Sequence, residues 1–315
     1  MELSRTDFTV ITKAAKALSM TAAEERVETF VARVLHLNAA QALDCFPTPD
    51  PLGLLSTTVA YLTQARESVL RIDCDLPTYV VYEDQIGNFW IAGSDTYFSN
   101  RSIPAALRAR LMEHSKIKQY LSRLSAGHDL EVIAAAILKS LCNYGEATQG
   151  SGDQGVDAIG RMELMKMEPA LYRGAVDKLG KDEAESMPGD HVFVLASSKA
   201  VIVAKSDTTR VINPAHIREL VGQWVIQRDD VGIWRKVGIR MLTPMQLILV
   251  TTYRLSDESV MLCRNLGVQV WGMPELIYLI CKVAPTNVFL AGGGSFSPTN
   301  FRKWWQARNI SRLTV

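Results

Sequence analysis

A glycine-rich turn in the middle of the chain surrounds one acidic residue, Asp157. The segment reads GSGDQGVDAIG over residues 150–160, and its first three glycines permit backbone conformations that other residues avoid, or a close approach to a ligand. Residues 156–159 then predict the start of a strand. The pattern indicates a carboxylate at a strand end, where it could bind a metal ion. The alternative is a plain β-turn whose aspartates bond their own backbone.

A second acidic residue, Glu131, lies in a predicted helix upstream of this turn. Asp129 is a suitable N-cap, and apolar residues recur at helical spacing over 130–141. Three, four and seven positions after Glu131 stand two alanines and a leucine, an apolar face on which an unpaired carboxylate is costly. Glu131 is therefore either a solvated residue favoured by the helix dipole or a second acidic group at the Asp157 site.

Downstream of the turn, residues 191–205 form the most strand-like run of the chain. They predict either one long buried strand or a hairpin that turns at residues 197–198. The run carries Lys199 and Lys205 and no acidic residue.

Helices and strands alternate beyond this run. The pattern predicts helices over residues 214–224, 256–266 and 274–283, and strands over 247–252 and 268–271. Alternation of this kind implies a sheet that is at least partly parallel.

Residues 128–283 resemble the Mrr-like restriction endonucleases of the PD-(D/E)xK superfamily. The resemblance rests on the helix with Glu131, on GDQGVD ending at Asp157, and on IRELVG and VTTYRLS further on. It implies an α/β fold with a restriction-endonuclease-like mixed sheet flanked by helices. In that family a glutamate on the first helix, the aspartate, and a Gln/Glu-x-Lys motif hold Mg²⁺ and a water that attacks a DNA phosphodiester.

The resemblance implies that Glu131 and Asp157 bind Mg²⁺ or Mn²⁺. Hard oxygen ligands suit Mg²⁺, which usually keeps several waters and takes only one or two carboxylates. The metal polarises the phosphoryl group and lowers the pKa of its bound water, while a lysine can orient or deprotonate that water. DNA is the partner that this chemistry implies.

The chain departs from the family at the lysine motif, because no Gln-x-Lys or Glu-x-Lys follows Asp157 at the expected distance. Ser197 and Lys199 match the motif best, with serine in the Gln/Glu position. Lys205 is the competitor and lies closer to the next helix, but Val203 then takes the ligand position. We favour Lys199, because a serine hydroxyl can hold a metal-bound water whereas valine cannot.

A second departure is an insertion of about 30 residues, 161–190, between the aspartate and the lysine strand. It predicts a charged helix, which is either a solvated surface helix or a lid over DNA. The chain has a net charge of only +1, but residues 199–240 hold eight Lys and Arg against four Asp and Glu. This excess could face phosphates or simply be a solvated surface.

The five widely spaced cysteines contain no CxxC and indicate neither zinc nor disulfides. The N-terminus lacks the pattern of a signal peptide, and no apolar run approaches about 20 residues. We therefore expect a soluble cytoplasmic protein without a membrane partner.

Three regions are expected. Residues 1–125 predict a mainly helical α+β domain for recognition, sensing or oligomerisation, with a capping box at 21–24. Residues 126–285 form the nuclease-like domain, and 286–315 a glycine-led basic aromatic tail. In the tail, aromatic residues 301, 304 and 305 stand at helical spacing, so they either face the core or stack on bases.

The sequence thus predicts a metal-dependent DNA endonuclease, in restriction or phage defence, that forms a homodimer or higher homo-oligomer. The alternative is a non-catalytic DNA-binding or partner-binding module on a degenerate nuclease fold. A further carboxylate at the site, from Glu146 or Glu163, would favour the enzyme.

Overall fold

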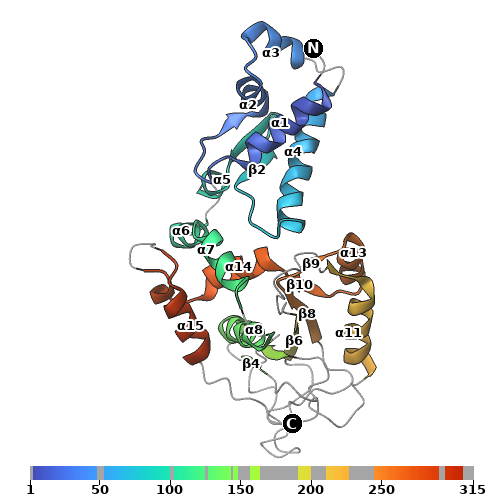
Figure 1. Cartoon of the computed structure of the whole chain (residues 1–315), viewed down its shortest axis with the longest axis vertical. Helices are drawn as coiled ribbons and strands as arrows, with labels where there is room; N and C mark the ends of the chain where they lie inside the picture. Colours follow the sequence, from blue (N-terminus) through green and yellow to red (C-terminus); the bar gives the residue numbers. More distant parts are fainter. Residues whose placement is uncertain are drawn as a thin grey trace, which may run out of the picture. The chain divides into compact units, whose positions relative to one another are not determined.

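The computed structural model of the chain divides into two compact units, Met1–Ser115 and Lys116–Val315 (Figure 1). The division falls before the boundary at 125/126 that the sequence predicts. The structure describes residues 3–47, 53–99, 103–124, 127–142, 145–147, 157–163, 191–199, 211–226, 245–290 and 295–307.

The first unit combines helices with a three-stranded antiparallel sheet in the order β1-β3-β2. Buried Phe8, Ile11, Phe30 and Leu62 join helices α1, α2 and α4 in one core. The elements are α1 (Arg5–Lys16), β1 (Glu25–Arg26), α2 (Val27–Val34), α3 (Ala39–Cys45), α4 (Leu54–Arg71), β2 (Tyr79–Glu83), β3 (Phe89–Gly93), α5 (Ser94–Ser99) and α6 (Ala105–Leu111). Helix α7 (His114–Leu121) begins here and lies mostly in the second unit.

The capping box expected at residues 21–24 is wrong. Helix α2 begins only at Val27, and the side chain of the residue before it, Arg26, accepts no hydrogen bond from the helix N-terminus. Residues 25–26 instead form β1 and pair with β3. Pairing with β3 provides hydrogen-bond partners for the backbone N–H and C=O groups of these residues. This long-range pairing outweighs the local capping-box pattern, which favours a helix start.

Gly93 ends β3 where the chain passes very close to the segment before β1. Its N–H donates to the Ala22 carbonyl at 3.0 Å. A Cβ at Gly93 would lie 2.3 Å from the Met20 carbonyl oxygen and 2.6 Å from the Ala22 amide nitrogen. Because both obstacles are backbone atoms, we expect Gly93→Ala to lower the free energy of unfolding by about 3 kcal/mol, as overpacked sites do. Urea denaturation followed by circular dichroism measures this loss.

Gly222→Ala is the control for this variant. Gly222 sits within a helix, and beyond the backbone of that helix no atom of the described residues lies within 4 Å of a Cβ built there. Alanine there should raise stability by about 0.5–1 kcal/mol. Equal stability of Gly93→Ala and the wild-type protein would contradict the close backbone approach.

The second unit is built on a five-stranded mixed sheet in the order β10-β8-β6-β5-β4. Strands β4, β5 and β6 are antiparallel neighbours, whereas β6, β8 and β10 run parallel. The strands are β4 (Gly145–Ala147), β5 (Ala158–Glu163), β6 (His191–Lys199), β8 (Met245–Thr251) and β10 (Gln269–Trp271). The mixed α/β architecture expected from the sequence is therefore present.

Helices flank this sheet, and a two-stranded parallel ladder lies beside it. The helices are α8 (Gly127–Cys142), α11 (Pro214–Ile226), α13 (Asp257–Asn265), α14 (Met273–Val283), the 3₁₀ helix η2 (Thr286–Val288) and α15 (Pro298–Ala307). The ladder joins β7 (Val211–Ile212) to β9 (Arg254–Leu255). Helices α8, α11, α13 and α14 lie close to the ranges that apolar periodicity predicts.

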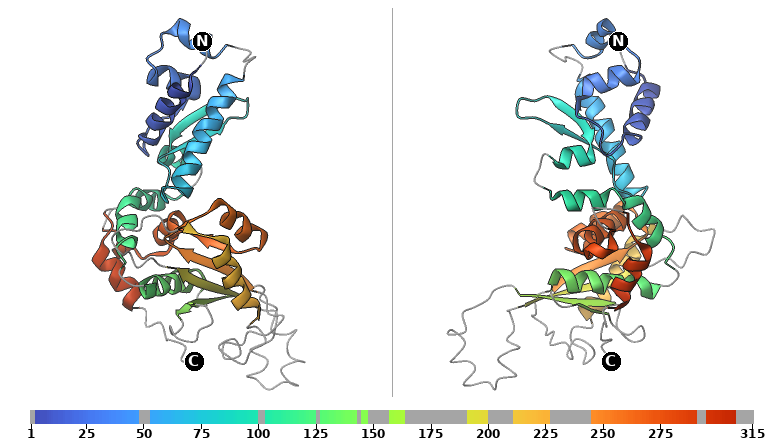
Figure 2. Two further views of the ribbon diagram at one scale, coloured as in Figure 1. Left: turned by 45° about the vertical axis from the view of Figure 1, so that its right-hand side comes forward. Right: turned by 90° about the vertical axis from the view of Figure 1, so that its left-hand side faces the viewer.

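Helix α8 covers one face of the sheet, over β4, β5 and β6 (Figures 1 and 2). Small residues on this face, Ala147, Ala158 and Gly160, are matched by a run of buried alanines in α8. A Cβ at Gly160 would lie 3.2 Å from the Leu138 Cδ2 atom. The small residues therefore let the helix approach the strands closely.

Helices α11 and α13 cover the opposite face. Ile159 of β5 and Leu249 of β8 form one buried cluster with Ile217 and Leu220 of α11 and with Cys263 of α13. Because successive side chains of a strand alternate between faces, Ile159 of β5 faces this cluster, whereas its neighbours Ala158 and Gly160 face α8.

The aromatic stripe of the C-terminal region is a core feature. Phe301, Trp304 and Trp305 of α15 are all buried, and the Phe301 ring lies 5.1 Å from the Tyr120 ring, centroid to centroid. This confirms the core-facing alternative, because the three rings have almost no exposed surface on which bases could stack.

All five cysteines are free thiols in the structure. Burial raises the pKa of the Cys142 and Cys263 thiols, which keeps them protonated at neutral pH. Among the described helices, none has both the length and the hydrophobicity needed to cross a bilayer.

Candidate functional site

The register of β5 against β6 determines where Asp157 stands. Ala158 pairs with Ala196 and Ile159 with Leu195 in an antiparallel ladder. Asp157 directly precedes β5, so continuing this register by one residue sets it opposite Ser197. Neighbouring strands lie about 5 Å apart, so the two positions are adjacent.

Lys199 belongs to the same face of the sheet. It follows Ser197 by two residues, and residues two apart on a strand share a face. Lys199 in turn pairs with Thr251 at the carboxyl end of β8, and Thr251 is fully buried. Asp157, Ser197, Lys199 and Thr251 are thus neighbouring positions at the end of the sheet where β5 begins and β6 and β8 end.

Glu131 comes from the layer on the other face. It is half-buried and is the fifth residue of α8, just after the first turn. Only residues 143 and 144 separate α8 from β4, so helix and strand run in opposite directions, and α8 runs along β5 in the same direction. Leu138 of α8 packs against Gly160 of β5, so the two elements can be compared from this contact. Glu131 lies about 10 Å before Leu138 along the helix, and Asp157 lies about 10 Å before Gly160 along the strand. Both carboxylates therefore stand at the same end of the sheet.

The two additional carboxylates considered from the sequence differ in position. Glu146 of β4 pairs with Ile159, which shares the face of Asp157. Diagonal neighbours on such a pair of strands are about 7–8 Å apart, so Glu146 is a near neighbour of Asp157. Glu163 lies six residues along β5, about 20 Å away, which is too far for a shared ion.

Several predicted features lie outside the described residues: Lys205, most of the glycine turn, and most of the insertion at 161–190. Within the part of the chain that the structure describes, no three His, Cys, Asp or Glu side chains come together as a metal site. Binding of Mg²⁺ by Asp157 and Glu131 stays a prediction from the sequence; two carboxylates are a number that suits Mg²⁺ when waters and substrate complete the shell.

No family model and no curated protein matches this sequence. The structure is similar to two solved restriction endonucleases. MspJI, solved in complex with a 27-mer oligonucleotide, aligns with a TM-score of 0.38 and 16% identity over 69% of this chain and 39% of that chain. The DNA modification-dependent enzyme AspBHI aligns with a TM-score of 0.38 and 12% identity over 73% of this chain and 60% of its own. The chain thus spans 39% and 60% of the lengths of these two enzymes.

Proposed function

We propose that the second unit is a metal-dependent DNA endonuclease domain, acting in restriction or phage defence. The observation that supports the proposal is the β5–β6 register, which ends at the Ala158–Ala196 pair. Continued by one residue, it sets Asp157 opposite Ser197, and Lys199 follows two residues later in β6. These are the positions that the resemblance to Mrr-like nucleases assigns to the aspartate and the Gln/Glu-x-Lys motif.

The residue types account for phosphodiester hydrolysis. Asp157, with Glu131 from α8, would hold Mg²⁺ or Mn²⁺, which supplies charge at the scissile phosphate and lowers the pKa of a bound water. Ser197 would hold a metal-bound water through its hydroxyl. Lys199 would orient or deprotonate the attacking water and act as a point charge on the phosphate.

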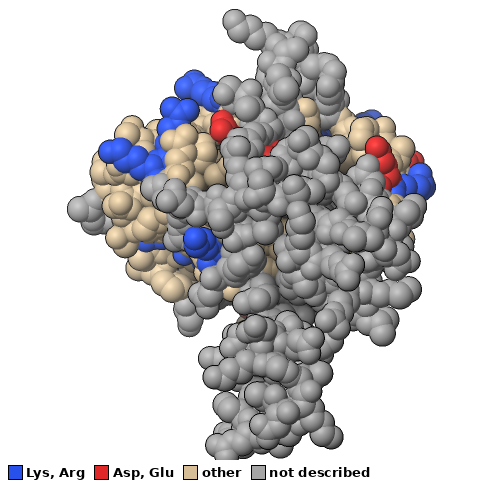
Figure 3. All heavy atoms as spheres, turned by 90° about the horizontal axis from the view of Figure 1, so that it is seen from below, with Lys and Arg blue, Asp and Glu red and all other residues tan. Residues whose placement is uncertain are grey.

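The charge distribution supports DNA contact by the second unit. The first unit carries 10 Lys and Arg against 14 Asp and Glu, whereas the second carries 24 against 19. Figure 3 shows described Lys and Arg side chains on the left of the face it draws, and others beside acidic side chains on the right. Phosphate contacts dominate DNA affinity, so we assign backbone contact to the second unit and recognition, sensing or oligomerisation to the first.

The decisive experiment incubates the full chain with plasmid and linear DNAs, modified and unmodified, with Mg²⁺, Mn²⁺ or EDTA. Cleavage in either metal and none in EDTA, read on gels, is the expected result. Light scattering of the same sample reports whether the protein is the expected homodimer or higher homo-oligomer.

A non-catalytic DNA-binding or partner-binding module is the second candidate, and Ser197 favours it. A serine supplies no negative charge, so a site of two carboxylates binds Mg²⁺ weakly until a substrate phosphate completes the shell.

Ser197→Glu separates the two candidates. An added carboxylate should lower the Mg²⁺ concentration for half-maximal cleavage by about tenfold, equivalent to about 1.4 kcal/mol of metal binding. Ser197→Ala, which offers no ligand, is the matched control and should not show this gain. If wild type and Ser197→Glu both bind DNA in a salt-sensitive manner but cut none with either metal, the binding module is the correct account.

A further inference from the structure

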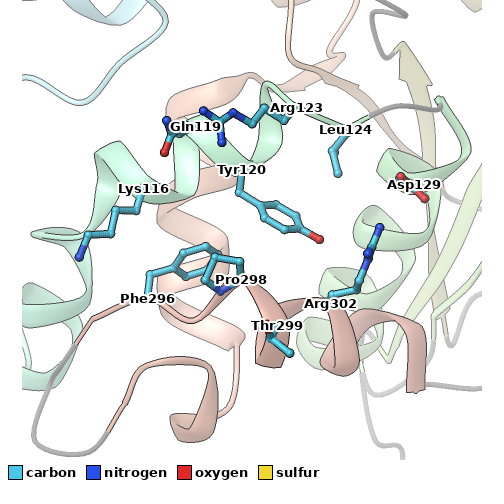
Figure 4. A pocket seen from close by; sticks show the side chains of 10 residues that line it. All are labelled: Lys116, Gln119, Tyr120, Arg123, Leu124, Asp129, Phe296, Pro298, Thr299 and Arg302. Carbon is cyan, nitrogen blue, oxygen red and sulfur yellow. The ribbon is translucent and has the colours of Figure 1, made fainter.

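The second unit contains an open cavity whose lining includes neither Asp157 nor Glu131. It lies between α7, the first turn of α8, the segment before α15, and α15 itself (Figure 4). Its volume is about 630 Å³, within the range of about 300–1,000 Å³ that small-molecule sites occupy. Sequence reasoning did not indicate it.

Cations dominate the lining of this cavity. Lys116, Arg123 and Arg302 stand against a single carboxylate, that of Asp129. Within the described part of the chain, neither Arg123 nor Arg302 has an ion pair with a carboxylate. The Lys116 Nζ atom donates to the Ser295 hydroxyl at 3.2 Å, so its charge is held at the rim. A formal excess of two positive charges favours an anionic ligand.

Aromatic rings form the apolar part of the lining. Tyr120 projects into the cavity toward Arg302 and Asp129 (Figure 4). Its ring meets Phe296 at 6.0 Å and Phe301 at 5.1 Å, both edge to face, which fixes its orientation from the core side. Burial raises the pKa of Tyr120, although the Trp305 indole and Arg302 act against the rise. Its hydroxyl is therefore protonated at neutral pH and can donate.

We propose that this cavity binds a nucleotide. A guanidinium group can bind two oxygens of one phosphate through two parallel N–H bonds. Arg123 and Arg302 each supply one such group. Tyr120 offers a ring for contact with a base. Asp129 distinguishes the ligand from a bare phosphate: its carboxylate repels an anion but accepts from the amino or hydroxyl groups of a base or sugar.

The nucleotide has two possible sources, a free nucleotide or one nucleotide of a DNA strand, and both present the same chemistry to the cavity. The inference does not depend on catalysis at Asp157. It is therefore tested by binding alone, in EDTA, where the proposed nuclease is silent.

The test uses isothermal titration of the full chain with ATP, inorganic phosphate or a 12-nucleotide single strand. The variant Arg123→Gln/Arg302→Gln removes both guanidinium groups. We expect it to weaken nucleotide binding by at least about 30-fold, since hydrogen bonds to charged groups are among the strongest in proteins. Lys303→Gln is the control, because Lys303 is exposed on the same helix and does not line the cavity. It should change affinity by less than about twofold.

Arg302→Lys keeps the charge but loses the planar guanidinium group, so it should weaken nucleotide binding less than the double variant does. This single variant provides the test if the double variant fails to fold. ATP binding that is lost in the double variant identifies a free nucleotide as the ligand. Loss of binding confined to the oligonucleotide identifies a DNA strand. Three results would overturn the inference: no probe binds, the arginine variants bind like wild type, or phosphate binds as tightly as ATP.

Discussion

Asp157→Asn is expected to lower the rate of DNA cleavage by about 10³-fold or more. The substitution removes the charge that would hold the metal ion, and the metal supplies both the activated water and the charge at the phosphate. The change in side-chain volume is small, so folding and metal-free DNA binding should persist. Single-turnover cleavage of a plasmid at saturating Mg²⁺ measures the loss.

Asp257→Asn is the matched control for this variant. Asp257 is an exposed carboxylate in the first turn of α13, outside the group of positions around Asp157. Its substitution should leave the cleavage rate within about twofold of wild type. Unchanged cutting by purified Asp157→Asn would remove the proposed site from consideration.

Lys199→Ala is expected to lower the cleavage rate by at least about 10²-fold, the usual effect of losing a general base or a charge stabiliser. Lys199 ends β6 on the face that the register assigns to Asp157, whereas an alanine offers neither charge nor proton acceptor. The variant should keep its affinity for Mg²⁺, since the lysine is not a metal ligand. Rapid-quench measurements over a range of Mg²⁺ concentrations separate the two effects.

Lys205→Ala provides the comparison that tests the assignment of the lysine. We expect it to cut at close to the wild-type rate. If Lys205→Ala cuts slowly and Lys199→Ala cuts at the normal rate, Lys205 is the catalytic lysine. Ser197 then has no role in holding the metal-bound water.

Much of the second unit follows from local patterns in the sequence. Apolar periodicity predicts α8, α11, α13 and α14 near their observed bounds, and the strand-like run beginning at residue 191 includes β6. The register between β5 and β6 could not be predicted, because the segment joining them is too long for its turn geometry to set the pairing. The shared face of Asp157 and Lys199 therefore became visible only in three dimensions.

Local signals mislead where a distant partner competes. Residues 21–24 carry the pattern of a capping box, yet residues 25–26 pair with β3 and delay the helix. The nucleotide cavity was missed for a related reason. Lys116, Asp129 and Arg302 come from three helices and Arg123 from the turn after α7, and no short-range spacing connects all four. In the tail, the sequence indicated a mixture of aromatic and basic residues, and the structure separates a buried aromatic stripe from an arginine at the cavity.

The ladder between β5 and β6 should make the proposed site tolerant of length changes between the two strands and intolerant of insertions within β6. The alignment of Asp157 with Ser197 follows from the adjoining Ala158–Ala196 pair. The length of the segment between the strands, residues 164–190, therefore does not determine that alignment. Shortening or lengthening it should leave the two positions aligned. A single residue inserted within β6 before Ser197 would shift every later residue to the opposite face. Ser197 and Lys199 would then move to the face that α8 covers. A one-residue insertion in β6 should therefore abolish their alignment with Asp157, whereas a deletion of many residues from 164–190 should preserve it.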